Sequence, residues 1–296
     1  MAAADQFTIS WSSPTLRADC VREVEGWLAS EGPRMDLRAE YPHVFHAEGR
    51  GEVASVAIDG RLLCHALVRE VTVVTEGGPA AYTLVGSVIT HPEQRHRGLA
   101  TNLLRGIAER AKQREQDAVC LWSSEWSFYE RLGFKPAGRQ AEMVLGPARG
   151  SLAPGIRPAE ARDVVALWEL HERKPLRVDR SLTDVALLLS IPHLRVLVLE
   201  RHGRAVAYAC YGKGTDFPNW WHEQGGSDED VATLIRGAMD VMGSTEATVL
   251  LPPYRTTLRA MLTSMQRTVR DGICALRYAI TEAGEAEFFI DGLDSV

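Results

Sequence analysis

The sequence predicts an α/β protein with a mixed, mostly antiparallel sheet that is built twice along the chain. Three strand-like segments, residues 52–58, 62–74 and 82–90, come first, and a helix-like and a fourth strand-like segment follow them. The same order returns loosely after residue 155. A chain of 296 residues is also longer than one hydrophobic core usually supports, which favours two domains.

The first half begins with strands joined by tight turns. Residues 7–11 alternate as a strand does, and a helical pattern follows from Pro14. Asp59 and Gly60 lie between the first two long strands. This pair favours a two-residue hairpin, because both positions of such a turn need a positive φ. We therefore expect an antiparallel meander.

A helix and a parallel strand follow the meander. Leu99, Leu103, Ile107 and Ala111 recur at helical spacing and form one apolar face. The crossover to the next strand, residues 117–123, is long enough to require parallel pairing with the third strand of the meander. Together these elements predict a mixed sheet.

Residues 146–155 form the clearest linker, because glycine and proline are dense there. This linker divides the chain into a first domain, residues 1–145, and a second domain, residues 156–296. In the second domain we expect a strand at Ile156, helices at 160–172 and 181–190, strands at 195–199 and 205–211, a helix at 228–242 and a strand at 247–251.

Composition excludes several classes of function. The net charge of −6 argues against a nucleic-acid partner and suits a cationic substrate. The N-terminus lacks a signal-peptide pattern, and no apolar run is long enough to cross a bilayer. The 5 cysteines are odd in number and widely spaced, which indicates reduced thiols. We expect a cytoplasmic protein without a membrane, nucleic-acid or metal partner.

The stretch THPEQRHRGLATNLL, residues 90–104, concentrates the features of an anion site. Pro92 ends the preceding strand, and the loop after it leads unpaired amides to the positive end of a helix. Gly98 has no Cβ, so a phosphate could approach the main chain closely. Arg95 and Arg97 can bind phosphate oxygens in a bidentate manner. The alternative is a solvated basic loop.

Two motifs together resemble a known family. Residues 95–100, RHRGLA, resemble the R-x-x-G-x-A pyrophosphate loop of the GCN5-related N-acetyltransferases (GNAT), and residues 128–134, FYERLGF, are similar to the F-Y-x-x-x-G-F segment of that superfamily. The resemblance covers about residues 5–145 and implies tandem GNAT domains whose central parallel strands splay apart. The S-E-x-x-x-Y spacing and the hairpin at 55–70 resemble the enhanced-intracellular-survival branch of aminoglycoside acetyltransferases.

The resemblance implies acetyl-CoA as the acyl donor. Its pantetheine arm would pair with the main chain of one strand, in the wedge where the two parallel strands part. Its pyrophosphate would bind the amides from His96 to Thr101. The residues expected at the cofactor are Val88, Ile89, Thr90, Arg95, His96, Arg97, Gly98, Leu99, Ala100, Thr101 and Ser124.

For catalysis, the resemblance implies that Tyr129 protonates the leaving thiolate of CoA. The alternative for Tyr129 is a core aromatic residue. A main-chain N–H of the Val88 strand would polarise the thioester carbonyl. The candidates for the general base are Glu70, Glu125, His65, His91, a water relay and the terminal carboxylate of Val296, which is the one that the survival branch suggests.

The second half offers no comparable loop. Residues 220–230, WWHEQGGSDED, stand where a phosphate loop should fall, and their acidic residues would repel a diphosphate. We therefore expect a degenerate GNAT-like domain. Phe217, Trp220 and Trp221 either line an acceptor groove between the domains or fill a core. The His-Glu pair in this stretch lacks a further ligand at helical spacing, so no metal site is expected.

The predicted function is transfer of an acetyl group from acetyl-CoA to a primary amine of a small, cationic acceptor, directly and within a ternary complex. Two alternatives remain open. One is acetylation of a protein or peptide amine, and the other is an acyl-CoA-binding sensor without catalysis.

Overall fold

The computed structural model describes residues 8–12, 18–30, 32, 34–46, 51–148 and 154–296. The strands in these ranges are β1 (Ile9–Ser12), β2 (Gly51–Ile58), β3 (Arg61–Thr75), β4 (Gly78–Thr90), β5 (Ala118–Leu121), β6 (Lys135–Leu145), β7 (Ile156–Pro158), β8 (Arg177–Val178), β9 (Arg195–Arg201), β10 (Arg204–Tyr211), β11 (Trp220–Gly226), β12 (Ala247–Leu251) and β13 (Gln266–Ala279).

The α-helices in the same ranges are α1 (Ala18–Ala29), α2 (Leu37–Glu40), α3 (Pro42–Phe45), α4 (Leu99–Gln113), α5 (Trp126–Glu130), α6 (Val164–Glu172), α7 (Leu182–Leu188), α8 (Asp228–Val241) and α9 (Thr256–Leu262). Short 3₁₀ turns are η2 (Pro92–Gln94), η3 (Ala161–Asp163), η4 (Thr263–Met265), η5 (Ala283–Glu285) and η6 (Gly292–Asp294). None of the described helices is both long enough and apolar enough to cross a membrane.

The first half contains the expected meander and crossover. β2, β3 and β4 are antiparallel neighbours, and Asp59 and Gly60 both have positive φ values, 51° and 79°, in the turn between β2 and β3. β5 pairs with β4 in parallel, from Tyr82–Ala118 to Val85–Leu121. The prediction of a mixed α/β sheet is therefore confirmed, and the positive φ values are those that a two-residue hairpin requires.

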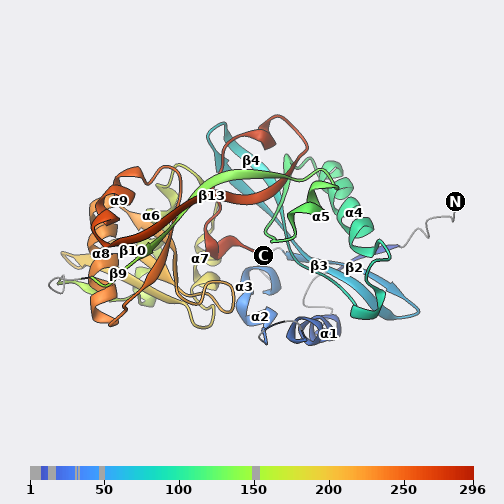
Figure 1. Ribbon diagram of the computed structural model, residues 1–296, viewed down its shortest axis with the longest axis horizontal. Coiled ribbons are helices and arrows are strands. Elements are labelled where there is room, and N and C mark those ends of the chain that lie inside the picture. The colour runs from blue at the N-terminus through green and yellow to red at the C-terminus, as the bar shows by residue number, and fades with distance from the viewer. Residues whose placement is uncertain (1–7, 13–17, 31, 33, 47–50, 149–153) are drawn as a thin grey trace.

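The sheet continues through the whole molecule instead of dividing at residues 146–155. Its strand order is β1-β2-β3-β4-β5-β13-β6-β12-β11-β10-β9-β7, and β8 pairs with β3. β13, from the end of the chain, lies between β5 and β6, and β6 lies between β13 and β12. Figure 1 shows β13 crossing from one half to the other. A late strand thus completes the sheet of the first half, and residues 149–153 of the expected linker lie outside the described residues.

Two cores cover the two faces of the first-half sheet. On one face, Leu103 and Ile107 of α4 pack in the same cluster as Val85. On the other face, Leu84 of β4 packs in a cluster with residues of α1, α2 and α3 and with Phe288 and Val296 from the end of the chain. Successive side chains of a strand point to opposite faces, which explains why Leu84 and Val85 join different cores.

The C-terminal segment 288–296 is buried along its whole length, between the two halves (Figure 1). Its carboxylates are paired within a buried ionic network. Arg180 binds Glu223 of β11, with Nη1 2.8 Å from Oε1, and also binds Asp294 of the segment, with Nη2 2.6 Å from Oδ2. Lys174 joins Glu223 to Asp291 in the same way, with N–O distances of 3.2 and 2.9 Å. The segment is therefore fixed by charges of the second half.

We expect Arg180→Met to lower the free energy of unfolding by about 3–5 kcal/mol, because it leaves two buried carboxylates without their principal partner. Urea denaturation measures the change. Arg201→Met is the matched control, since the Arg201–Asp230 pair has an arginine side chain that is 54% exposed, and an exposed pair contributes about 0–1 kcal/mol. Equal effects of the two variants would show that the network does not hold the segment.

Cys64, Cys120, Cys210 and Cys274 are free and buried, and the side chain of Cys20 lies outside the described residues. Burial raises the pKa of the Cys274 thiol to about 12 and that of Cys120 still further. These thiols are therefore protonated at neutral pH and pack as small apolar side chains.

Candidate active site

The two central parallel strands of the first half part after a short paired stretch. β4 and β5 pair as far as Val85 and Leu121, where β5 ends, whereas β4 continues to Thr90 along β3. Among the described residues, no strand pairs with the side of Val88, Ile89 and Thr90 that faces away from β3. Their main chain therefore forms one wall of an open wedge, and its role in binding a pantetheine arm stays a prediction.

A β-bulge lies at the apex of this wedge. The register between β3 and β4 shifts there, so that His65 pairs with Ile89 but Leu67 pairs with Gly86. Ser87 adopts the left-handed conformation with φ 47°. A bulge changes the direction of the main-chain groups next to it and is common beside active sites. His65 is buried under the bulge, with Nδ1 3.2 Å from the Ser87 carbonyl oxygen.

The stretch after β4 forms the expected loop. Residues 91–98 separate β4 from α4, and Gly98 is the helix N-cap, with φ 79° and no side-chain cap on the helix. A Cβ on Gly98 would meet nothing within 4 Å. The first turn of α4 contains no acidic residue. The first amides of α4 therefore face open space at the positive end of the helix, which fits a pyrophosphate.

The two arginines of this loop lie on its surface. Arg95 is exposed, with Nε 3.5 Å from the Thr90 carbonyl oxygen, and Arg97 is exposed and donates to Gln94. His96 has φ 61° between them. Leu99, the first residue of α4, is buried, whereas Ala100 and Thr101 are partly exposed. The loop thus presents main-chain amides flanked by two exposed guanidinium groups.

Tyr129 lies on α5 and belongs to the core on the α4 face of the sheet. It is mostly buried, and its ring packs edge-on against Phe128 and Phe134, with centroids 4.9 and 5.9 Å away. Burial raises the pKa of Tyr129, and a hydrogen bond with the Ser123 hydroxyl partly opposes this. The phenol is therefore protonated at neutral pH, as an acid must be. Ser124 follows Ser123 and is exposed at the mouth of the wedge.

The candidate bases are not equally close to the apex of the wedge. Glu70 binds Arg114, with Oε1 2.7 Å from Nη1, and pairs with Thr83, away from the register shift between His65 and Leu67. His91 lies on the loop, with Nε2 3.0 Å from Nη2 of Arg61. Glu125 is exposed at the start of α5. The geometry therefore separates these three residues from the apex and leaves His65 beside it.

Val296 also lies at the apex. A Cβ built on Gly86 would overlap the carbonyl oxygen and carbon of Val296, so the main chain of Val296 rests directly on β4, one residue beyond its last pair with β5. Val296 packs in the core on the α1–α3 face, and only 7% of its surface is exposed.

The second half has a related strand-helix-strand unit without the wedge. β11 and β12 are parallel neighbours at Trp220 and Trp221. Beyond them, the side chain of Gln224 bridges the strands, because its Nε2 donates to the Leu250 and Trp221 carbonyl oxygens at 3.0 and 3.2 Å. The corresponding space between the strands is therefore filled by the protein's own side chains.

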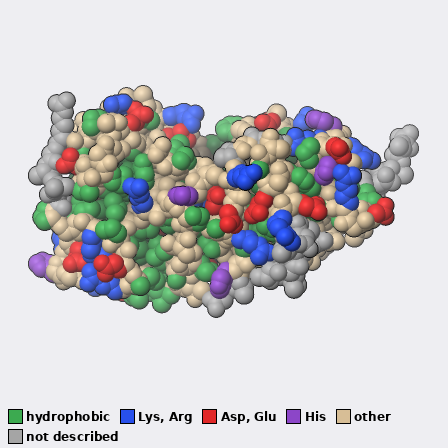
Figure 2. Space-filling model, turned by 90° about the horizontal axis from the view of Figure 1, so that it is seen from below, with side chains coloured by type: hydrophobic (Ala, Val, Ile, Leu, Met, Phe, Trp, Pro, Cys, Tyr) green, Lys and Arg blue, Asp and Glu red, His purple; other side chains and the backbone are tan. Residues whose placement is uncertain are grey.

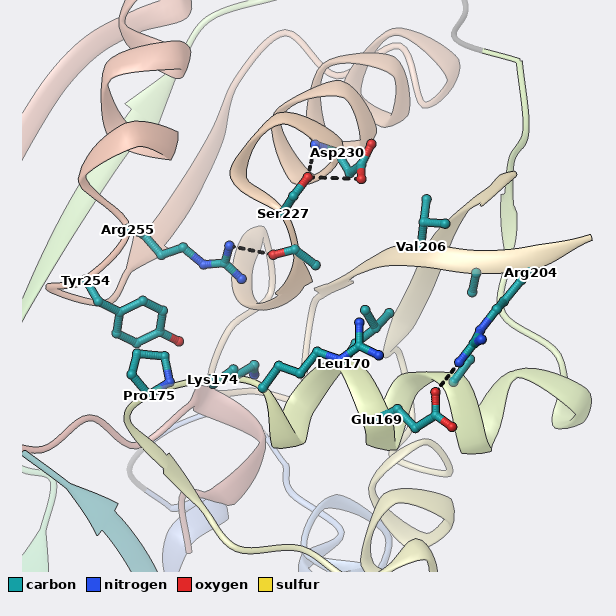
Figure 3. A pocket seen from close by; sticks show the side chains of 14 residues that line it. Glu169, Leu170, Lys174, Pro175, Arg204, Val206, Ser227, Asp230, Tyr254 and Arg255 are labelled. Atoms are coloured by element: carbon teal, nitrogen blue, oxygen red, sulfur yellow. Dashed lines mark hydrogen bonds and ion pairs between the residues drawn. The ribbon is translucent and has the colours of Figure 1, made fainter. Parts of the chain in front are cut away.

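The helix start in the second half is also closed. Ser227 alone separates β11 from α8, and it caps the helix by accepting from the amide of Asp230 at 3.1 Å. The guanidinium of Arg255 donates to the carbonyl oxygen of Gly226 at 2.8 Å and to Asp228 at 2.6 Å. Figure 3 shows Arg255, Ser227 and Asp230 around this end of a pocket of about 580 Å³. With a cap and three acids in its first turn, α8 does not favour a diphosphate.

One group of potential metal ligands is present among the described residues. Ligand atoms of His171, Glu223 and Asp291 lie within 4.8 Å of one another. Lys174 already donates to both carboxylates of this group. Burial raises the pKa of Glu223, but the charges of Arg180 and Lys174 outweigh this effect and hold the pKa well below its usual range. We therefore interpret the group as the centre of the ionic network and not as a cation site.

The aromatic residues of the 217–221 region do not line one groove. Trp221 is fully buried in the core of the second half, and Trp220 packs on the edge of the other core. Phe217 stacks on the ring of His222, with centroids 5.1 Å apart. Of the two roles left open for Trp221, lining an acceptor groove or filling a core, the structure supports the second.

Residues 30–137 match the family model described as "Acetyltransferase (GNAT) domain". This range includes both motifs, at 95–100 and 128–134, so the match agrees with the predicted resemblance of the first half to GNAT acetyltransferases. A comparison with curated proteins gave no match.

Solved structures resemble the whole chain at low sequence identity. One is a probable N-acyltransferase from Enterococcus faecalis V583, with 12% identity, a TM-score of 0.72 and coverage of 92% of this chain and 72% of that one. A GCN5-related N-acetyltransferase from Kribbella flavida has 18% identity, a TM-score of 0.68 and coverage of 96% and 74%. Eis1 from Mycobacterium abscessus has 17% identity and a TM-score of 0.62, with coverage of 92% of this chain and 73% of that one. At these identities the likeness concerns the fold.

Proposed function

We propose that this protein transfers an acetyl group from acetyl-CoA to a primary amine of a small, cationic acceptor, within a ternary complex. The observation that carries the proposal is the open main chain of Val88–Thr90 beyond the last pair of β4 with β5. The uncapped start of α4 at Gly98 follows this strand in the chain, and the phenol of Tyr129 lies on α5, which follows β5. This is the set of groups that binding and cleaving a CoA thioester requires.

The second half has a different role in this proposal. Its strand gap is bridged by Gln224, and its helix start is occupied by Arg255 and three acids. We propose a single cofactor site, in the first half. The second half then supports the end of the chain through the ionic network around Glu223.

The acceptor amine must be neutral when it attacks, so a base must take its proton directly or through one water. Of the candidate side chains, we propose His65 as this base, because it lies beside the bulge at the apex of the wedge, with Nδ1 3.2 Å from the Ser87 carbonyl oxygen. A main-chain N–H of the bulge at Ser87 would stabilise the developing oxyanion.

Two carboxylates lie on the α1–α3 side of the sheet, and both accept hydrogen bonds. Glu40 is buried and accepts from Thr215, and Asp216 accepts from the Tyr41 hydroxyl at 2.8 Å. Figure 2 shows Asp and Glu side chains near the middle of this face, with Lys and Arg side chains beside them. Together with the net charge of −6, these groups support a cationic acceptor.

Release of CoA thiol from acetyl-CoA, measured with a panel of amines, tests this function. The panel contains spermidine, an aminoglycoside and a lysine peptide. Fast release with spermidine or the aminoglycoside is the expected result. Release with the peptide alone would make the protein a peptide acetyltransferase. Tight binding of acetyl-CoA with no release for any amine would indicate a sensor and contradict the proposal.

We expect Tyr129→Phe to lower kcat about 100-fold with little change in the affinity for acetyl-CoA, because the variant removes the proton donor to the thiolate and keeps the ring. Stopped-assay kinetics and calorimetric binding measure the two quantities. Tyr278→Phe is the matched control, since Tyr278 packs on Phe134 in the same aromatic cluster, with centroids 5.7 Å apart. A kcat for Tyr129→Phe equal to that of the control would remove Tyr129 from the mechanism.

A further inference from the structure

One pocket of the second half lies between α6 and the start of α8, and the proposed reaction does not use it (Figure 3). Its volume is about 580 Å³, and its walls come from α6, the first residues of β10, the end of β11 and the pair Tyr254 and Arg255. Sites for small organic molecules usually have volumes of about 300–1,000 Å³. The pocket is therefore large enough for a small ligand.

One wall of this pocket carries two buried hydrogen-bond donors that have no acceptor. The hydroxyl of Tyr254 and Nε of Arg255 are both without a hydrogen-bond partner among the described residues. Only 6% of Arg255 is exposed, and its Nη1 and Nη2 donate to the Gly226 and Gln224 carbonyl oxygens. Burial raises the pKa of Tyr254, so the phenol is protonated and can donate at neutral pH. Buried donors without an acceptor cost free energy, which a ligand oxygen would recover.

The charged residues of the lining leave an excess of positive charge. Glu169 forms an ion pair with Arg204, and Asp230 is bound by Arg201, with Oδ1 2.7 Å from Nη2. These two are the acidic residues of the lining, so each already has a cationic partner. Arg173, at the end of α6, also lines the pocket, and it is exposed and without a partner in the described part of the chain. The excess favours an anionic ligand.

The remaining surface of the pocket is apolar. Leu170 of α6 and Val206 of β10 lie across the pocket from Tyr254 and Arg255, and Pro175 lies next to the Tyr254 ring (Figure 3). An apolar wall accommodates the body of a ligand, and a few polar groups fix its orientation. The arrangement therefore fits a molecule with one anionic end and a short apolar body.

We propose that this pocket binds a small monocarboxylate, whose oxygens accept hydrogen bonds from Tyr254, Arg255 and Arg173 and whose apolar body packs on the opposite wall. A single negative charge suits the site better than a phosphate, because the two acidic residues of the lining would repel further charge. The proposal is independent of the proposed function, since no residue of the first-half wedge takes part in it. It gives the second half a ligand of its own.

Calorimetric titration of the full chain with sodium hexanoate tests this site. Hexanoate joins one carboxylate to a short alkyl chain, and we expect a dissociation constant of about 1 mM or lower. Hexanamide has the same shape without the charge, and inorganic phosphate has the charge without the apolar body. We expect both to bind about 10-fold more weakly than hexanoate. Excess CoA is expected to leave the constant for hexanoate unchanged.

Arg173→Met should weaken the binding of hexanoate about 10-fold, because it removes the unpaired cation of the site. Its side chain is exposed, so the substitution does not disturb a core. Arg105→Met is the matched control, since Arg105 is also exposed and without a partner among the described residues, but lies on α4. The two variants change the net charge equally, so a difference between them reports the site and not the general field of the protein.

Tyr254→Phe should weaken the binding of hexanoate about 5-fold, because it removes the donor hydroxyl and keeps the ring. Tyr211→Phe is its control, since the Tyr211 hydroxyl donates to Asn219 at 3.2 Å outside the pocket. Diffraction at the bromine absorption edge, from crystals soaked in a bromine-labelled hexanoate, locates the apolar body. We expect the bromine peak between Leu170 and Val206.

Several outcomes would overturn the proposal. They are the absence of hexanoate binding, binding of hexanamide or phosphate as tight as that of hexanoate, equal affinities of Arg173→Met and Arg105→Met, and a bromine peak outside the pocket. Loss of hexanoate binding in excess CoA would place the carboxylate in the first half and would also overturn it. Absence of turnover with every amine would contradict the proposed function alone, and the hexanoate titrations would still decide this site.

Discussion

Gly98→Glu is expected to abolish measurable binding of acetyl-CoA, with the dissociation constant raised about 100-fold or more. Gly98 caps α4 with φ 79°, and a Cβ at this position points into open space. A glutamate side chain would therefore enter the space above the first amides of the helix and place a negative charge at the proposed pyrophosphate site. Calorimetry with acetyl-CoA measures the change.

Gly203→Glu is the matched control for this prediction. Gly203 also has a positive φ, 76°, and open space around its Cβ, but it lies in the turn between β9 and β10. The two variants share the backbone strain of a side chain at positive φ and differ in the site. Gly98→Ala isolates that strain at the site itself and should weaken binding much less. Comparable affinity in Gly98→Glu and Gly203→Glu would rule out the loop as the pyrophosphate site.

The sequence predicted those elements whose signals are local. The Asp59-Gly60 turn, the apolar face of α4 and the parallel pairing of β5 follow from residues close together in the chain. β13, residues 266–279, was not predicted. It carries charges at Arg267, Arg270 and Asp271 and pairs with strands far away in the sequence. Strand formation depends on such partner strands, so the residues of β13 alone do not predict a strand.

β11 and the C-terminal segment were missed for a related reason. In β11, Glu223 is buried, which a pattern of apolar residues cannot predict, because its partners Lys174 and Arg180 come from another part of the chain. The segment 288–296 is buried through similar pairs of Asp291 and Asp294. The sequence named the Val296 carboxylate as one candidate base among several. Only the fold could place it beside Gly86 and place Glu70 and His91 elsewhere.

Gly86→Ala is expected to lower kcat about 100-fold and to leave the affinity for acetyl-CoA nearly unchanged. The added methyl group would overlap the main chain of Val296, and β4 cannot yield because β3 pairs with it at this point. The segment 288–296 must therefore move and change the shape of the apex of the wedge beside His65, whereas the loop at residues 91–98 is untouched. Steady-state kinetics and calorimetry measure the two quantities.

Gly284→Ala separates this displacement from a general loss of stability. A Cβ on Gly284 would overlap the main-chain carbonyl of Asp117, so the steric conflict is of the same kind, but it lies away from the wedge. We expect both variants to melt at lower temperature and only Gly86→Ala to lose turnover. The buried His65 provides the other test. If His65→Asn removes turnover while Gly86→Ala retains it, the imidazole beside the bulge acts in the reaction and the packing of Val296 on β4 does not control it.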